Sequence, residues 1–292
     1  MPWRARGRRA YNRLMPADLG KITVFCFAAS YAVALAAELL QQFLQRPALR
    51  WLALGFASAG LVAHTAYVAV NPLPLQTSFG SLIFLAWILA VFCWFGSIHH
   101  RRLTWGLFVL PLVLGLIGLA QLFPEGSPPR TSESAAEPFS LQGKQFWPIF
   151  HGALILLAAV GVSVAFVASA MYLVQGHRLK TKQLPGKGLK LWSLERLEQM
   201  NRRAIVLAFP LLTVGLLIAA FQMAQLPGGG DGLENLKVLS TIALWVVFAI
   251  LLYLRYGVRA GGRQVAWLTI VAFALMLFAL IAVHPFPAGG AE

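Results

Sequence analysis

The chain has 292 residues, of which 59% are hydrophobic and 12% charged, and its formal net charge is +14. Soluble domains carry about 25% charged residues, so this composition and a mean hydropathy of +0.71 exclude a single water-soluble core and predict an integral membrane protein. The positive charge does not indicate nucleic-acid binding, because the basic residues lie between apolar stretches and form no recognisable binding motif.

Apolar stretches of about 20 residues, long enough to cross a hydrocarbon core of about 30 Å, recur along the chain. We therefore predict an all-α fold, a polytopic transmembrane helix bundle. Its eight spans are expected at residues 20–42, 51–70, 79–98, 103–123, 146–175, 204–226, 237–256 and 264–284. The expected domains are a basic tail (1–19), a single transmembrane domain (20–285) and a short C-terminal tail (286–292).

The basic residues predict the orientation. Fifteen of the 24 Lys and Arg lie in or beside the segments after the first, third, fifth and seventh spans. Positive charge favours the cytoplasmic side, so we place these segments inside a bacterial inner membrane and both termini outside. Five arginines within residues 1–13 conflict with that orientation. Either translation starts at Met15, which we favour because the internal segments agree, or the tail stays inside and the topology inverts.

The segment 177–203 is the main predicted cytoplasmic feature. Apolar residues recur in it at nearly helical spacing, with Ser193 as a candidate N-cap, which predicts a short amphipathic helix. We interpret it as a helix lying beside anionic lipid headgroups, with a docking site for a partner protein as the alternative.

The two cysteines carry no motif. Cys26 and Cys93 lie in apolar stretches without CxxC or CxxCH spacing, so we expect small buried hydrophobic residues.

Three histidines are predicted at the outer side of the membrane. His64 lies six residues before the outer end of its span and His151 five residues after the start of its own, which places both about 7–9 Å deep at 1.5 Å per residue. His284 ends the last span on the same side. Trp147 and the polar residues Gln121, Gln222 and Gln225 are expected there too.

Ionisable side chains at membrane depth usually face a bundle interior and mark function. Neutral imidazole is a good axial ligand of haem iron, and two histidines on different helices could hold the macrocycle from both sides. The alternative for each is a hydrogen bond to a neighbouring carbonyl or water, which we favour for His284. Zinc is less well supported, since no HExxH motif or carboxylate pair accompanies these residues.

Several segments together resemble the membrane proteins of the cytochrome c assembly family, particularly its eight-span CcsA/HemX-like branch. They are TSFGSLIFLAWILAVF (77–92), LTWGLFVLPLVLGLIGLA (103–120), FWPIFHGALILLAAVGVSVAFVASAMYLVQGHRLK (146–180), SLERLEQMNRRAIVLAFPLLTVGLLIAA (193–220) and LKVLSTIALWVVFAILLYLRYGVRAGGR (236–263). The resemblance extends over about residues 50–285, most of the chain.

The resemblance implies a membrane protein that handles haem, either for attachment to c-type cytochromes or in regulating tetrapyrrole synthesis. It implies a non-covalent haem b with His64 and His151 as axial ligands to the iron, and with His284 and Trp147 beside it. It implies partners among cytochrome c assembly proteins or a tetrapyrrole-synthesis enzyme docking at 177–203. Haem-exporting members carry a WGxxWxWD segment that this chain lacks, which favours an accessory or regulatory member.

Two other functions stay open. A small-solute transporter would use broken helices or internal repeats around a midplane site, and only Pro111 and Pro210 lie deep within spans. A membrane scaffold would act through 177–203. No motif for bond-making chemistry is present, so we do not expect an enzyme.

Overall fold

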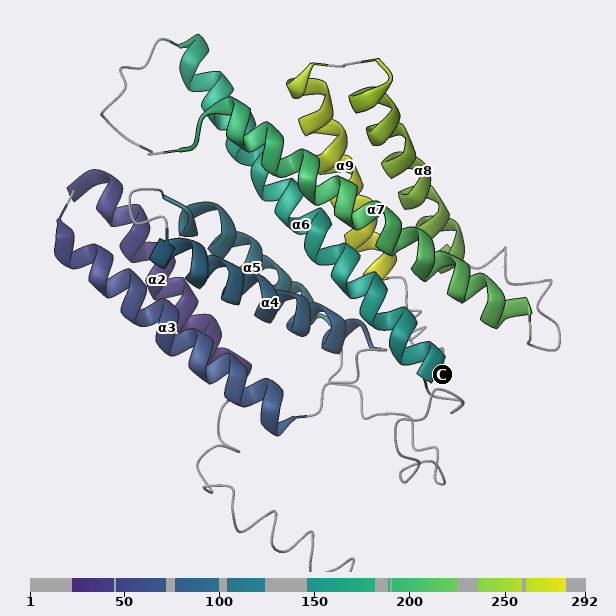
Figure 1. Cartoon of the computed structure of the whole chain (residues 1–292). Coiled ribbons are helices and arrows are strands. Elements are labelled where there is room, and N and C mark those ends of the chain that lie inside the picture. Colours follow the sequence, from purple (N-terminus) through teal and green to yellow (C-terminus); the bar gives the residue numbers. More distant parts are fainter. Residues whose placement is uncertain are drawn as a thin grey trace, which may run out of the picture. The chain divides into compact units, whose positions relative to one another are not determined.

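The computed structural model (Figure 1) describes residues 23–44, 46–71, 77–99, 104–123, 146–181, 189, 191–224, 236–258 and 261–281. The secondary structure of these residues is entirely helical. The helices are α2 (Val24–Leu44), α3 (Pro47–Val70), α4 (Ser78–His99), α5 (Gly106–Ala120), α6 (Phe146–Lys180), α7 (Leu194–Ala224), α8 (Leu236–Tyr256) and α9 (Gly262–Ile281). The all-α fold is therefore confirmed, and each predicted span coincides with one helix.

Seven of the described helices are long and apolar enough to cross a membrane, and the chain is an integral membrane protein. The exception is α5, whose 15 residues extend about 22 Å at 1.5 Å per residue. The stretch predicted as a span at 103–123 is longer because Thr104 and Trp105 precede the helix and a turn follows it at Gln121.

The amphipathic segment before the sixth span is helical, and it is continuous with that span. Helix α7 runs for 31 residues from Leu194, so the predicted short helix forms its first turns. Ser193 is the N-cap, since its Oγ accepts a hydrogen bond from the Arg196 backbone N–H at 3.4 Å. Leu197 is fully buried, which shows that these turns pack against the protein.

The chain divides into two compact units. Helices α2 and α3 pack as an antiparallel hairpin in the first, and α4 to α9 form the second. That 20–285 acts as a single domain stays a prediction. The basic tail over 1–19 and the C-terminal tail over 286–292 lie outside the described residues.

In the second unit, α6 packs closely along α7 and also against α9, while α4 pairs with α5 and α8 with α9 (Figure 1). Small residues allow α6 and α7 to approach each other. A Cβ atom added at Gly161 would lie 2.9 Å from the Ala208 Cβ and 3.3 Å from the Ala204 carbonyl oxygen. Such small-residue contacts are typical of helix packing in membranes.

The cysteines differ from each other. Cys93 is buried as predicted, whereas Cys26 is exposed on α2, so the expectation was wrong for Cys26. An apolar side chain costs little on a surface facing lipid, which removes the reason to bury it.

Candidate functional site

His151 lies in the second turn of α6, and its ring orientation is fixed by α7. Its Nδ1 lies 2.8 Å from the backbone carbonyl oxygen of Gly215. A carbonyl can only accept, so Nδ1 carries the proton and donates. A neutral ring in this tautomer has its lone pair on Nε2. This carbonyl contact on the second nitrogen is the arrangement that metal-ligating histidines commonly have.

Glycine at position 215 permits this contact. A Cβ atom there would lie 2.8 Å from the Ile155 Cδ1 atom, and Ile155 is one turn beyond His151 on α6. The absent side chain lets α6 come close enough for the histidine to reach the α7 backbone. Trp147, one turn before His151, is 44% exposed and so forms part of the surface at this end of α6.

His64 lies on α3 inside an aromatic cluster of the first unit. Its side chain is fully buried. Its ring stacks on Phe27 of α2, with centroids 4.1 Å apart and planes 3° from parallel. Its Nδ1 lies 3.4 Å from the hydroxyl oxygen of Tyr31. Tyr67 packs on the other side of the cluster, with its centroid 5.5 Å from that of Phe27.

The helix ends give the position of each histidine along its own helix, while its depth in a membrane stays a prediction. His64 lies six residues before the end of α3 at Val70, and His151 lies five residues after the start of α6 at Phe146. The two belong to different units, so their joint binding of one ligand stays a prediction.

Other residues expected at the outer side are less informative. Gln121 is exposed and ends α5. His284, Gln225 and the side chain of Gln222 lie outside what the structure describes.

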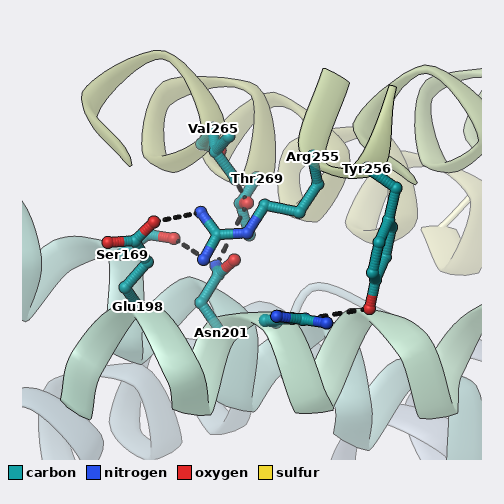
Figure 2. Close-up of polar contacts among 8 residues, drawn as sticks. Ser169, Glu198, Asn201, Arg255, Tyr256, Val265 and Thr269 are labelled. Carbon is teal, nitrogen blue, oxygen red and sulfur yellow. Dashed lines mark hydrogen bonds and ion pairs between the residues drawn. The ribbon is translucent and has the colours of Figure 1, made fainter. Parts of the chain in front are cut away.

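A second polar cluster, which is not among the sites predicted from the sequence, lies where the end of α6 meets the start of α7 and of α9. Figure 2 shows the Asn201 amide between Ser169 and Thr269. Its Nδ2 donates to Ser169 Oγ at 2.8 Å and to Thr269 Oγ1 at 3.2 Å, and it lies 3.1 Å from the Ala165 carbonyl oxygen. Each hydroxyl donates its own proton to a carbonyl of its own helix, which leaves oxygen lone pairs for the amide. We refer to Ser169, Asn201 and Thr269 as the Asn201 cluster.

A small cleft, with room for about one water molecule, borders the Asn201 cluster. Beside it, Arg255 of α8 forms an ion pair with Glu198 of α7 (Figure 2). Arg202 donates from Nε to the Tyr256 hydroxyl at 2.9 Å and lies over that ring. The cleft lies at the helix ends that bear the basic segment.

The sequence did contain a signal for this cluster. Ser169 and Thr269 are polar residues in apolar stretches, both near the predicted inner ends of their spans. Asn201 lies in the basic segment 177–203 among Glu and Arg residues, a setting that predicts an exposed side chain rather than a buried one.

Within the helical part that the structure describes, no three His, Cys, Asp or Glu side chains converge on a point that could hold an ion. The Nδ1 atom of His64 contacts the Tyr31 hydroxyl, and the Nδ1 atom of His151 contacts the Gly215 carbonyl oxygen.

Comparison with known proteins relates the chain to one family. Residues 75–287 match the family described as "Cytochrome C assembly protein". This range contains α4 to α9 with His151, and it begins after His64.

Curated relatives match over most of their length. Protein HemX of Brevibacillus brevis is 25% identical over 206 residues, which covers 70% of this chain and 72% of the relative. Cytochrome c biogenesis protein CcsA of Guillardia theta is 24% identical, covering 77% of each chain. CcsA of Gloeobacter violaceus is 24% identical, covering 79% of this chain and 82% of the relative. No solved structure matches the chain.

Proposed function

The chain belongs to the cytochrome c assembly protein family, and on that premise we propose that it binds haem b non-covalently near the outer face of the membrane. His64 and His151 are the proposed axial ligands, with Trp147 and His284 beside the macrocycle. Imidazole nitrogens are common protein ligands of haem iron, and these two side chains would hold it.

The hydrogen bond from His151 to Gly215 is the observation that carries this proposal. It assigns the proton to Nδ1, holds the ring in one orientation and leaves the donor lone pair on Nε2. The alternative, a histidine that only bonds a neighbouring carbonyl, makes the same contact, and haem binding by the wild-type protein separates the two. His151 also lies within the range that matches the family.

His64 fits haem under one condition. Its ring is fully buried and stacked on Phe27 in an apolar setting. Ligation requires the Nε2 edge of the ring to become reachable by the haem. His64 is the residue on which the proposal is most easily contradicted.

We propose an accessory or regulatory role rather than complete haem export. The sequence has nine tryptophans but no WGxxWxWD segment to present haem outside the membrane. The relatives carry the names HemX and CcsA, the latter a cytochrome c biogenesis protein. We further propose a bacterial inner-membrane location with both termini outside, assembly or tetrapyrrole-synthesis partners at 177–203, and no catalysis by the chain itself.

Visible spectroscopy tests the ligand pair. Wild type, His64→Ala and His151→Ala are purified in detergent, and spectra are recorded before and after addition of haem. We expect a low-spin bis-imidazole spectrum in wild type that each substitution abolishes, because either one removes an axial nitrogen. His99→Ala is the matched control. His99 is the exposed last residue of α4, at a helix end predicted to face the cytoplasm, and its ring stacks on Phe95. Its loss should leave the spectrum unchanged.

Identical spectra in the four proteins, or no saturable haem binding by wild type, would contradict the proposal. If the protein keeps its function when both histidines are replaced but loses it when the basic segment 177–203 is removed, the result would instead indicate a scaffold. Loss of uptake of a small solute by cells that lack the protein would indicate a transporter.

A further inference from the structure

Arg202 of α7 is held in one place by a tyrosine of α8. Its Nε donates to the Tyr256 hydroxyl at 2.9 Å, and its guanidinium carbon lies 4.7 Å from the centroid of that ring. These contacts engage Nε and leave the N–H groups of both terminal nitrogens available. Among the described residues, Arg202 contacts no carboxylate, and its side chain is exposed.

The same contact leaves a second donor beside the guanidinium. Guanidinium nitrogens cannot accept a hydrogen bond, so the Tyr256 oxygen is the acceptor and its own proton points elsewhere. That proton has no acceptor in the part of the chain that the structure describes, and Tyr256 is 50% exposed. Arg202 and Tyr256 therefore offer a guanidinium fork and a hydroxyl proton at one place on the surface.

The acidic residue best placed to neutralise Arg202 is bound elsewhere. Glu198 lies four residues before Arg202 on α7, a spacing at which glutamate and arginine commonly pair on a helix. In the structure, Glu198 pairs instead with Arg255 of α8 (Figure 2). Arg202 therefore keeps its positive charge for another partner.

The neighbouring helix ends are basic as well. The exposed basic residues at the end of α6 and the start of α7 and α9 are Lys180, Arg196, Arg203 and Arg263. The acidic residues described there are Glu195 and the paired Glu198. The surface around Arg202 thus favours an anionic ligand.

Exposed aromatic side chains indicate where this surface lies in a membrane. Tyr253 is 67% exposed near the end of α8, and Trp267 is 55% exposed near the start of α9. Tyrosine and tryptophan are enriched where membrane-spanning helices pass the lipid headgroups. The phosphate groups of that layer belong to phospholipids, and a guanidinium fork binds phosphate in a bidentate manner.

We propose that Arg202 and Tyr256 bind the headgroup phosphate of one anionic phospholipid, in the leaflet that faces the basic segment 177–203. The guanidinium donates from its terminal nitrogens and the tyrosine from its hydroxyl, while Arg255 keeps Glu198 away. The acyl chains lie in the bilayer, so the site needs no enclosed cavity. A helix merely lying beside headgroups would attract lipid through all its exposed arginines alike, whereas this site distinguishes Arg202 from Arg203. The inference does not depend on haem binding.

Lipid titration tests the inference. The full-length protein in detergent is titrated with phosphatidylglycerol, or with phosphatidylcholine as the lipid of no net charge, and bound lipid is measured by native mass spectrometry. Wild type should prefer phosphatidylglycerol. Arg202→Gln should weaken its binding by about 10- to 100-fold, and Tyr256→Phe by about ten-fold, because each removes hydrogen bonds to a charged group. Arg203→Gln is the matched control, since it removes an equal charge from the adjacent exposed arginine, and it should weaken binding by at most about five-fold.

Two further comparisons separate a phosphate site from simple charge. Arg202→Lys keeps the charge but loses the planar fork, so it should bind the lipid nearly as weakly as Arg202→Gln. Inorganic phosphate should displace the lipid no better than chloride at equal ionic strength, because the acyl chains also hold the lipid. Each variant must elute as a single species with wild-type helicity, which shows that it is folded.

Several results would overturn the inference. Wild-type lipid binding in Arg202→Gln, or equal losses in Arg202→Gln and Arg203→Gln, would leave only diffuse attraction. Full binding by Arg202→Lys would contradict the guanidinium fork, and ready displacement by inorganic phosphate would indicate a soluble anion. A photoreactive group at Tyr253 should cross-link to lipid in cells. A dominant cross-link to protein that Arg202→Gln abolishes would instead identify a docking site for an acidic partner.

Discussion

At the residue scale, Asn201 shows how a buried polar side chain of the second unit is hydrogen-bonded by its neighbours. Its amide is 5% exposed and donates to the hydroxyls of two other helices. Each of those hydroxyls donates its own proton to a carbonyl of its own helix and accepts from the amide, so every donor in this contact faces an acceptor. The Asn201 cluster therefore joins α6, α7 and α9.

Replacing Asn201 by leucine should lower the free energy of unfolding by about 1–2 kcal/mol, because interhelical hydrogen bonds in membrane proteins contribute about that much. Thr269→Val removes only one acceptor at nearly constant shape, and we expect a smaller effect. Both are measured by denaturant titration in detergent. Equal stability of Asn201→Leu and wild type would mean that the cluster contributes specificity without stability.

The sequence predicted single residues unevenly. His151 and Ser193 stood out because each is a polar residue at a position where local pattern gives it a meaning, a histidine in an apolar helix and a hydroxyl before a helix. The partners of those residues could not be predicted. Gly215, Phe27 and Tyr31 are ordinary residues of apolar stretches, and only packing brings them to the histidines.

At the scale of elements, the α6–α7 pair depends on a few glycines. Gly161 faces Ala204 and Ala208, and Gly215 faces Ile155, both at close range. Gly152 lies on the same helix as Gly161, yet nothing lies within 4 Å of the position its Cβ would take. The two glycines of α6 therefore provide a matched pair for substitution.

Gly161→Ala should destabilise the protein by about 1–3 kcal/mol, since the added methyl group overpacks the interface against a backbone carbonyl. Gly152→Ala should be neutral or stabilising by up to about 1 kcal/mol, because alanine favours the helix and meets open space. Thermal unfolding in detergent compares them. Equal unfolding temperatures in the two variants would argue against a close α6–α7 contact.

The positions of the helices were predictable from apolar run length, since each predicted span coincides with a helix. The amphipathic helix after Ser193 is also predicted from the sequence, but its continuity with the next span is not, because charged residues such as Glu198 and Arg202 interrupt the apolar pattern. In the structure Glu198 pairs with Arg255, Arg202 lies over the Tyr256 ring, and α7 runs without a break from Leu194.

At the scale of the whole molecule, the distribution of Lys and Arg predicts which helix ends face the cytoplasm. Thr181, exposed after the end of α6, should be inside, and Gln121, exposed after α5, should be outside. In a protein whose Cys26 and Cys93 are replaced by alanine, a cysteine at 121 should react with an impermeant maleimide in intact cells. A cysteine at 181 should react only in inverted vesicles. The reverse pattern would support the inverted topology.

Composition was sufficient to predict membrane insertion, because a largely apolar chain of this length would expose too much apolar surface in water. The division into α2–α3 and α4–α9 could not be predicted, since both parts have the same hydrophobic character. Whether a site joins the two units depends on packing between surfaces that are apolar on both sides, and apolar composition does not encode a specific partner.

The Asn201 cluster also has a consequence for biogenesis. Helices enter the membrane in the order of synthesis, and α9 is the last of the described helices to be made. Until it arrives, the Asn201 amide has only its α6 acceptors, Ser169 and Ala165. Thr269 completes the set when α9 docks. The cluster thus distinguishes a nascent chain from a finished one, because a product lacking its last helix would lose the Thr269 contact and leave these polar side chains uncovered by α9, where quality-control proteases could recognise them.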